Sequence, residues 1–222
     1  MNMNWLLFMI SFIIFVKPMN SLSFQVLGLS LQWPPSWCHA NNLVCHRRPI
    51  PEKFLIHGVW PMNQTNNGNV ILQQCSSGPP FHPFLSVSYI NKLDSKWMNL
   101  KHSTPPPPNN IKLQSFWKHE YEKHGGCFGY TRDHYFNTGM ALYKGYDIIN
   151  ILTQNNIHRG LRYQVTAFND AIAGAVGKNV ALNCNNFQEL SEVLICFDPT
   201  VQSPVDCPRH RDRCGTGDIY MP

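Results

Sequence analysis

Apolar and polar residues alternate along the chain between Phe24 and Trp33. One set of alternate positions is Leu27, Leu29, Leu31 and Trp33, and the other is Val26, Gly28, Ser30 and Gln32. Alternation with a period of two residues predicts a strand. A second apolar stretch, residues 54–60, predicts another strand and carries His57 between apolar neighbours. The apolar runs at residues 180–182 and 193–197 predict two more strands.

The apolar positions take a helical period in the middle of the chain. Residues 113–123, 134–152 and 169–176 are therefore predicted to be helices. Residues 63–110 are rich in Asn, Gly, Ser and Pro, and the four consecutive prolines at 105–108 predict an exposed loop. Strands and helices that mix without a repeated strand–helix–strand unit indicate an α+β fold in one domain.

The first residues have the character of a secretory signal. Residues 5–16 form an apolar run of about a dozen residues, which is too short for a relaxed membrane span. The small-x-small sequence Ser21-Leu22-Ser23 that follows suits signal peptidase. We therefore expect a signal peptide at 1–23, a mature domain at 24–222 and a secreted, extracellular protein. The alternative is an uncleaved anchor, but no later apolar segment or flanking charge run supports one.

All the cysteines lie beyond the expected cleavage point. They are Cys38, Cys45, Cys75, Cys127, Cys184, Cys196, Cys207 and Cys214. An even number of cysteines in a secreted chain predicts four disulfides, although eight cysteines allow 105 pairings. No Cys-x-x-Cys pair is present to begin a metal site, so no metal is expected. After Cys196 the cysteines and prolines crowd together, which indicates a stapled region rather than regular structure.

The charge of the chain is compatible with a polyanionic ligand. The formal net charge is +5, and removal of residues 1–23 takes away one lysine and no acid, which leaves +4. Many secreted proteins are as basic, so this balance alone decides little. The ten histidines would add positive charge below about pH 6.5. Asn63-Gln64-Thr65 is a sequon, and secretion would make Asn63 a glycosylation site.

The segment around His119 must first be tested as a zinc-protease motif. His119-Glu120 opens the zincin signature, which needs a second histidine four residues after the first. Position 123 is a lysine, whose ammonium group would repel zinc. His124 comes five residues after His119, about 140° away around a regular α-helix. The zincin interpretation therefore fails.

The same segment suits the binding of a phosphate. His119 and Lys123, and likewise Glu120 and His124, are four residues apart and would share one broad helix face. Histidine can serve as acid or base near neutrality, and lysine stabilises charge on phosphate oxygens. The alternative is a solvated polar helix face. His57 by itself would most often be a core histidine, but the two segments together supply the acid and base of phosphodiester cleavage.

At these residues the sequence resembles the ribonuclease T2 family. One family hallmark matches Ile-His-Gly-Val-Trp-Pro at 56–61, and the other matches Phe-Trp-Lys-His-Glu-Tyr-Glu-Lys-His-Gly-Gly-Cys at 116–127. Val59 replaces a leucine of the hallmark, and Tyr121 replaces a tryptophan. The resemblance also includes residues 31–34, 97–100 and 195–198, and so covers essentially the whole mature chain. Met98 stands where the family usually has proline.

The resemblance implies a fold and an activity. The fold would be a central antiparallel sheet flanked by helices and stapled by disulfides. The activity would be endonucleolytic cleavage of single-stranded RNA by a monomer that uses no metal or cofactor and does not bind a membrane. The first product would be a 2′,3′-cyclic phosphate, which is then hydrolysed to a 3′-phosphate. DNA would be inert because the ribose 2′-hydroxyl is the nucleophile.

The resemblance also implies roles for particular residues. His124 would be the general base and His57 the general acid, while the residues themselves leave open which histidine has which role. The phosphate would be held by His119, Glu120 and Lys123. A base-binding pocket would be formed by Gln32, Asn99, Leu100 and Phe116, and Trp60 would orient His57. The implied disulfides are Cys38–Cys45, Cys75–Cys127, Cys184–Cys214 and Cys196–Cys207.

Within the family, the chain is most similar to the self-incompatibility ribonucleases of the plant pistil. It is basic, its sequon follows Trp60-Pro61 closely, and the stretch between the two motifs is irregular and rich in asparagine. Such a protein would present a variable surface to a protein partner from pollen. One alternative is a ribonuclease of defence or phosphate scavenging. Another is a catalytically silent storage or lectin-like binding protein, against which the complete set of five catalytic residues speaks.

Overall fold

The computed structural model describes residues 24–42, 44–65, 68–74, 78–208 and 213–222. The strands are β1 (Val26–Gln32), β2 (Leu55–Thr65), β3 (Gly68–Ile71), β4 (Arg162–Gln164), β5 (Ala181–Cys184), β6 (Leu190–Phe197), β7 (Pro204–Val205) and β8 (Asp218–Tyr220). The α-helices are α1 (Pro34–Ala40), α2 (Val87–Asp94), α3 (Ser115–Glu120), α4 (Gly126–Phe128), α5 (Arg132–Tyr143), α6 (Ile148–Gln154) and α7 (Val165–Val176). A π-helical turn, η1 (Tyr121–Gly125), connects α3 to α4.

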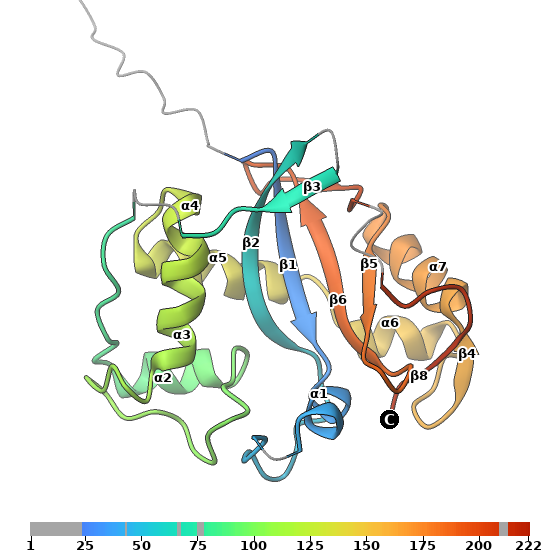
Figure 1. Cartoon of the computed structure of the whole chain (residues 1–222), viewed down its shortest axis with the longest axis horizontal. Coiled ribbons are helices and arrows are strands. Elements are labelled where there is room, and N and C mark those ends of the chain that lie inside the picture. The colour runs from blue at the N-terminus through green and yellow to red at the C-terminus, as the bar shows by residue number, and fades with distance from the viewer. Residues whose placement is uncertain (1–23, 43, 66–67, 75–77, 209–212) are drawn as a thin grey trace, which may run out of the picture.

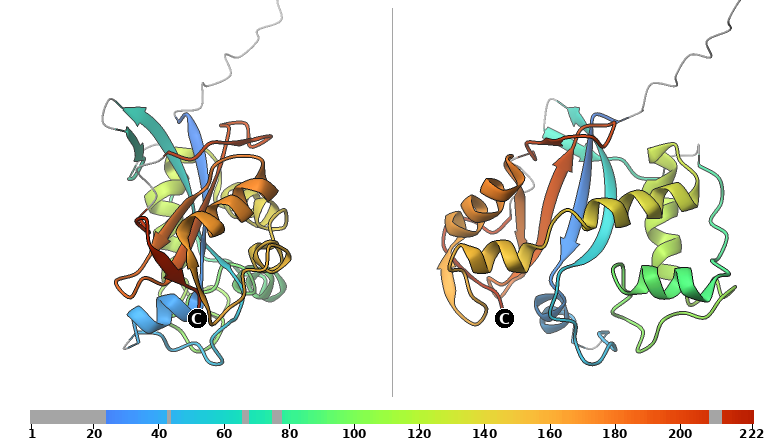
Figure 2. Two further views of the ribbon diagram at one scale, coloured as in Figure 1. Left: turned by 90° about the vertical axis from the view of Figure 1, so that its right-hand side faces the viewer. Right: turned by 180° about the vertical axis from the view of Figure 1, so that it is seen from behind.

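The main sheet is antiparallel, with the strand order β3-β2-β1-β6-β5 and with β7 paired to β6. Strands β2, β1, β6 and β5 lie side by side across the centre of the molecule (Figure 1). Strands β4 and β8 form a separate two-stranded sheet. Seen from behind, α5 crosses the central strands, α6 and α7 lie toward the edge of the sheet at β5, and α2, α3 and α4 stand on the other side of the molecule (Figure 2). The expected α+β fold, with a central antiparallel sheet flanked by helices, is confirmed.

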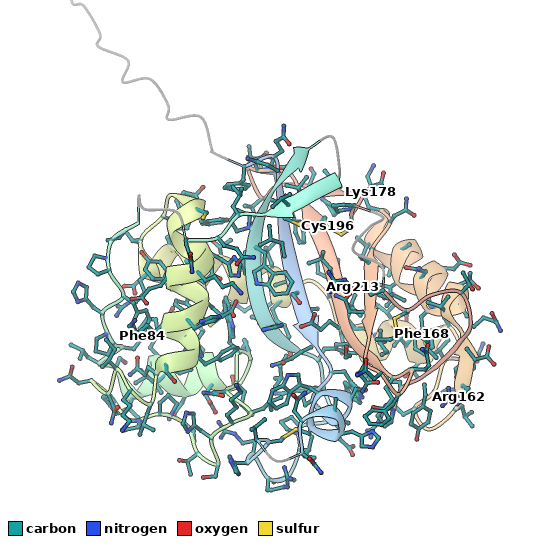
Figure 3. All side chains as sticks on the ribbon, in the orientation of Figure 1. Phe84, Arg162, Phe168, Lys178, Cys196 and Arg213 are labelled. Carbon is teal, nitrogen blue, oxygen red and sulfur yellow. A yellow bond between two sulfur atoms is a disulfide. The ribbon has the colours of Figure 1, made fainter. Side chains whose placement is uncertain are left out.

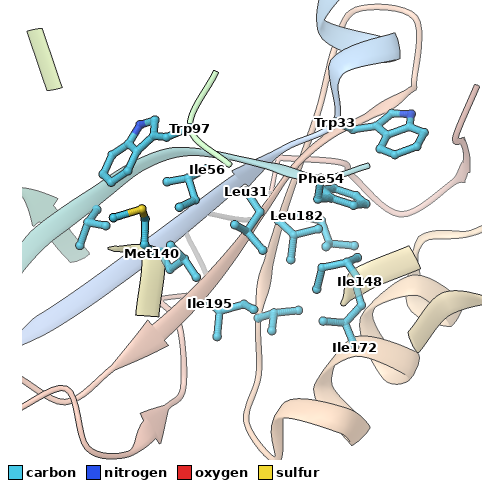
Figure 4. Close-up of a cluster of buried hydrophobic side chains, with 14 of the residues drawn as sticks. Leu31, Trp33, Phe54, Ile56, Trp97, Met140, Ile148, Ile172, Leu182 and Ile195 are labelled. Carbon is cyan, nitrogen blue, oxygen red and sulfur yellow. The ribbon is translucent and has the colours of Figure 1, made fainter. Parts of the chain in front are cut away.

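The main hydrophobic core lies between the sheet and helices α5, α6 and α7. Leu31 of β1 is fully buried in it, as expected from the alternation in that strand. Ile56 of β2 lies beside Leu31, and Met140, Ile148 and Ile172 reach this face from the three helices (Figure 4). Burial of apolar side chains of this size removes about 1.5–3 kcal/mol each from the cost of folding. This face of the sheet is therefore structural.

The opposite face of the sheet carries two smaller apolar clusters and a polar region. One cluster is formed by Met62, Ala181, Leu194, Cys196 and Cys207, and the other by Cys38, Cys45, Leu55 and Leu100. Gln32 of β1 and Glu192 of β6 are direct neighbours in the strand register on this face. Gln32 is buried although it is polar. The sequence alternation therefore separates a core face from a face with polar groups held in place.

Two predicted helices are interrupted in the structure, and the third, predicted at 169–176, begins earlier, at Val165. The predicted helix at 134–152 is two helices, α5 and α6, which are separated by residues 144–147. Gly145 follows the end of α5, and the Asp147 side chain accepts a hydrogen bond from the Asn150 backbone N–H and so caps α6. The predicted helix at 113–123 begins at Ser115 and passes through the π turn into α4. The region after Cys196 also contains short strands, β7 and β8, where regular structure was not expected.

Three of the four disulfides that the family resemblance implies are present in the structure. The structure contains Cys38–Cys45, Cys184–Cys214 and Cys196–Cys207, and the yellow sulfur atoms beside Cys196 mark the last of these in Figure 3. The fourth expected bridge, Cys75–Cys127, stays a prediction because Cys75 lies outside the described residues. The expected signal peptide at 1–23 lies outside them as well. Within the described part of the chain, every helix is too short or too polar to cross a bilayer.

Candidate active site

A cleft of about 530 Å³ opens between the polar region of the sheet and the helical segment α3–η1. All the side chains that the sequence assigned to catalysis or base binding line it, namely Gln32, His57, Trp60, Asn99, Leu100, Phe116, His119, Glu120, Lys123 and His124. Further lining residues, to which sequence analysis gave no role in the site, are Trp37, Ile71, Gln73, Met98, Lys101 and Ser115. The fold therefore brings both histidine segments to one place.

His57 is the extra residue of a β-bulge in β2. Ser30 of β1 pairs with Gly58 and Leu31 pairs with Ile56, which leaves His57 without a partner in that register. A bulge takes a side chain out of the regular alternation, and bulges recur beside active sites. The carbonyl group of His57 accepts a 2.7 Å hydrogen bond from Trp97 Nε1. The imidazole lines the cleft, and the carbonyl group at the bulge keeps a hydrogen-bond donor.

The imidazole of His57 lies between carboxylates from two elements. Its Nδ1 forms a short hydrogen bond with Glu192 Oε1 on β6, and its Nε2 lies 3.9 Å from Glu120 Oε1 on α3. Burial alone lowers the pKa of a histidine, but Glu192 and Glu120 outweigh it and raise the pKa of His57 from 6.5 to about 9. His57 is therefore a cation at neutral pH.

Gly58 allows Trp60 and Glu120 to meet beside His57. Trp60 Nε1 donates a 3.2 Å hydrogen bond to Glu120 Oε2, and the Trp60 ring meets the His57 ring edge-on at 5.2 Å. A Cβ atom at Gly58 would lie 2.2 Å from Trp60 Nε1 and 2.3 Å from Glu120 Oε2. The backbone packs so closely here that only glycine fits, which explains the third residue of the motif at 56–61.

The π turn brings the second histidine segment onto one face. The hydrogen bonds of a π-helix join residues five apart, so residues i and i+5 lie nearly above one another. His119 and His124 have this spacing, and both line the cleft together with Glu120 and Lys123. The angle of about 140° applies to a regular α-helix, and this segment departs from one because His119 lies in the last turn of α3 and His124 lies in the π turn. Among the described residues, no group of three His, Cys, Asp or Glu side chains is placed to hold a metal ion.

His124 is held in the opposite electrostatic state to His57. Only 3% of its surface is exposed, and its Nδ1 lies 3.0 Å from the carbonyl oxygen of Leu72. Because a carbonyl only accepts hydrogen bonds, Nδ1 carries the proton and Nε2 keeps its lone pair. Burial lowers the pKa of His124 to about 4, although the hydrogen bond to Leu72 opposes the change. His124 is therefore neutral, with an unprotonated nitrogen, across the physiological range.

Hydrogen bonds from indole groups tie the two histidine segments together. Trp117 of α3 donates from Nε1 to the carbonyl of Trp97 at 2.7 Å, and Trp97 in turn donates to the carbonyl of His57. Both indoles are almost fully buried. The Trp60 ring also lies 5.9 Å from the His124 ring, centroid to centroid. The position of α3 relative to β2 is therefore fixed by buried contacts.

The part of the cleft that would receive a base is the part lined by Leu100 and Phe116, and it is apolar. The Phe116 ring lies 6.3 Å from the His57 ring at an interplanar angle of 25°. Leu100 is buried nearby, and the Asn99 side chain accepts a 3.0 Å hydrogen bond from the Lys101 backbone N–H. Met98, which departs from the usual motif, packs against the apolar cluster that contains Leu100. A flat ring, an apolar wall and fixed amide groups together suit a planar heterocycle.

Residues 24–207 match the ribonuclease T2 family. The chain belongs to this family. Ribonuclease S-2 of Nicotiana alata is 35% identical over 188 residues, which cover 84% of this chain and 83% of that protein. The crystal structure of the self-incompatibility associated SF11-RNase of Nicotiana alata is 31% identical, has a TM-score of 0.78 and covers 89% of this chain and 98% of its own. A crystal structure of RNase NT in complex with 5′-AMP is 26% identical and has a TM-score of 0.71. The match covers 90% of this chain and 98% of RNase NT.

This T2-type endoribonuclease keeps the packing of the second motif although it has Tyr121 in place of tryptophan. The Tyr121 ring is buried, and its hydroxyl donates a 3.3 Å hydrogen bond to the carbonyl of Tyr130. A Cβ atom at Gly125 would lie 2.3 Å from the Tyr121 ring, so glycine is required inside the π turn. The substitution therefore preserves the ring that supports the turn.

Proposed function

We propose that this cleft cleaves single-stranded RNA by transphosphorylation, with His124 as general base and His57 as general acid. The observation that carries the proposal is the opposite protonation of the two histidines. The acid must begin protonated and the base must begin neutral. A carboxylate faces Nδ1 of His57, while a backbone carbonyl faces Nδ1 of His124. The different partners support the roles that the family resemblance implies.

In the first step, Nε2 of His124 takes the proton of the ribose 2′-hydroxyl as the O2′–P bond forms. Nε2 of His57 gives its proton to the O5′ atom as the P–O5′ bond breaks. The products are a 2′,3′-cyclic phosphate and a new 5′-hydroxyl end. In the second step His57 takes a proton from water as the water oxygen bonds to phosphorus, and His124 protonates O2′ as the P–O2′ bond breaks, which leaves a 3′-phosphate. Each histidine then returns to its starting state.

Charge develops on the non-bridging phosphate oxygens during both steps. His119 and Lys123 line the cleft and would stabilise that charge. Burial raises the pKa of the Glu120 carboxyl, while His57 and the Trp60 hydrogen bond oppose that change. When it is protonated, a carboxyl group in this position can donate a hydrogen bond to a phosphate oxygen. Phe116, Leu100, Asn99 and Gln32 would hold the base.

The enzyme proposal is tested with purified protein, RNA and EDTA at mildly acidic pH. We expect oligonucleotides that end in 2′,3′-cyclic phosphate, and no cleavage of DNA or of RNA methylated at the 2′-oxygen. If no products that end in a cyclic phosphate form, the proposed transphosphorylation is wrong. His57→Ala and His124→Ala should each abolish turnover, whereas the control His82→Ala, which is exposed and outside the cleft, should not. Near-normal turnover by either cleft variant would contradict the assigned roles.

We further propose that the protein is secreted after removal of residues 1–23 and acts in pistil self-incompatibility. The similarity to ribonuclease S-2 and SF11-RNase of Nicotiana alata supports this role. Pistil-restricted expression and many divergent alleles are expected, together with a mature N-terminus near Phe24. Expression in leaves under phosphate starvation, without allelic divergence, would favour the scavenging alternative instead.

A further inference from the structure

Glu192 contacts the proposed active site from the sheet side. It lies on β6, and β1 separates that strand from β2, which carries His57. Its Oε1 forms the short hydrogen bond with His57 Nδ1, and its Oε2 lies 3.4 Å from Asn183 Nδ2. Glu192 is not among the residues that line the cleft. It therefore reaches the substrate only through His57.

We infer that Glu192 is a positioning residue for His57: its carboxylate holds the Nδ1 proton, so that the imidazole presents its other nitrogen, Nε2, to the leaving oxygen. This inference rests on the proposed reaction. A carboxylate only accepts hydrogen bonds, so the ring nitrogen that faces it must carry a proton in both states of the histidine. After Nε2 has given its proton to O5′, Nδ1–H stays on the ring.

The strand geometry makes this contact specific. Both partners lie beside irregularities of the sheet, because β2 bulges at His57 and the register between β5 and β6 shifts next to Glu192. In between, Gln32 of β1 is the direct register neighbour of Glu192. Gln32 also pairs with Leu55 of β2, two residues before His57, so the register places Glu192 and His57 on the same face of the sheet on either side of β1.

The other charged groups around His57 do not replace Glu192. From α3, Glu120 faces Nε2 at 3.9 Å and favours the cation, but it lies on the substrate side. From η1, Lys123 disfavours the cation, and His124 is neutral there. Glu192 is thus the carboxylate that acts on His57 without contacting the phosphate. It sets which of the two nitrogens is available for chemistry.

The unaltered protein allows the first test, which needs no activity. The ring nitrogens of His57 should be followed by ¹⁵N NMR as the pH rises. We expect Nδ1 to stay protonated while Nε2 loses its proton, and a neutral ring with its proton on Nε2 would overturn the inference. Because this readout needs no RNA, it separates a failure of the Glu192 role from a failure of the proposed reaction.

The second test compares Glu192→Gln with the control Glu189→Gln. Glu189 is a carboxylate that likewise pairs with a histidine, His39, at 2.8 Å, but both lie outside the cleft. For Glu192→Gln we expect kcat/KM to fall roughly tenfold or more near pH 8 and to stay within about threefold near pH 5. Without the carboxylate, a smaller fraction of His57 than in the wild type is protonated at high pH. Glu189→Gln should keep the wild-type profile. If Glu192 had only a structural role, the substitution would lower Tm and leave the alkaline limb of the pH profile of kcat/KM unchanged. That result would contradict the inference.

Discussion

The indole of Trp60 donates a 3.2 Å hydrogen bond to the Glu120 carboxylate, and Gly58 lies against both groups. This contact joins strand β2 to helix α3 across the catalytic cleft. It depends on the missing side chain at position 58, since a methyl group there would overlap both partners. The precision of the site is therefore set by backbone packing as well as by the reactive side chains.

Substitution Gly58→Ala should disrupt the site more than the fold. The added Cβ would displace Trp60 and Glu120, and a shift of about 1 Å in an active site lowers activity roughly 100-fold. Overpacking of this kind lowers the free energy of unfolding by about 1–3 kcal/mol. Steady-state kinetics and urea unfolding measure the two effects.

Gly174→Ala in α7 is the matched control, because open space surrounds that position. It should keep full activity and raise the free energy of unfolding by about 0.5–1 kcal/mol. A Gly58→Ala protein with wild-type kinetics would show that the contact between Trp60 and Glu120 is dispensable.

The pH dependence of kcat/KM should be bell-shaped and wide. The proposed reaction requires neutral His124, so the acidic limb should follow its pKa of about 4. It also requires protonated His57, so the alkaline limb should follow its pKa of about 9. Initial rates on a dinucleotide across this range provide the check. Two limbs that both fall close to 6.5, the ordinary value of histidine, would contradict the electrostatic description of the cleft.

His124 should also make the protein less stable in acid. The unfolded chain binds a proton at this residue below about pH 6.5, while the folded chain resists it down to about pH 4. The free energy of unfolding therefore falls as the pH drops through this window, by about 3 kcal/mol from this residue alone. In His124→Asn that part of the dependence should be absent. Urea unfolding at several pH values compares the two proteins, and parallel curves would refute the assignment.

Phe116→Ala should weaken substrate binding without affecting the fold. Stacking of a base on an aromatic ring contributes about 1–3 kcal/mol, so KM for a dinucleotide should rise roughly tenfold or more. Phe187→Ala is the control, because Phe187 is exposed and stacks on His39 outside the cleft. If both variants have the same KM as wild type, the base lies elsewhere.

Sequence patterns predicted the strands β1, β2, β5 and β6, and the family hallmarks predicted the residues of the cleft, because both depend on local order. The strands β3 and β4 and the helices α1 and α2 were not predicted. The alternation from residue 24 to 33 predicted β1. The two histidine motifs contain seven of the assigned cleft residues, and the resemblance at residues 31–34 and 97–100 supplied Gln32, Asn99 and Leu100. The break at residues 144–147 also had local signals, Gly145 and Asp147, which the apolar spacing on both sides concealed. Local information was sufficient wherever neighbouring residues determine the conformation.

Two features of the site had no local signal. A single π turn changes the helical period for one turn only, so the apolar spacing around Tyr121 still resembles an α-helix. Glu192 lies 135 residues from His57, and only the pairing of β1 with β2 and β6 brings the two together. Such contacts depend on tertiary register, which a pattern in one segment does not determine.

The hydrogen bonds that run from Trp117 through Trp97 to His57 have a consequence for how this protein can change over time. These hydrogen bonds fix the width of the cleft from inside the molecule. The exposed residues at 85–88 and the largely exposed stretch at 103–109 therefore contribute little to that width. Substitutions there can accumulate without moving the two histidines. A protein built in this way can present many different outer surfaces to other molecules while its chemistry stays the same.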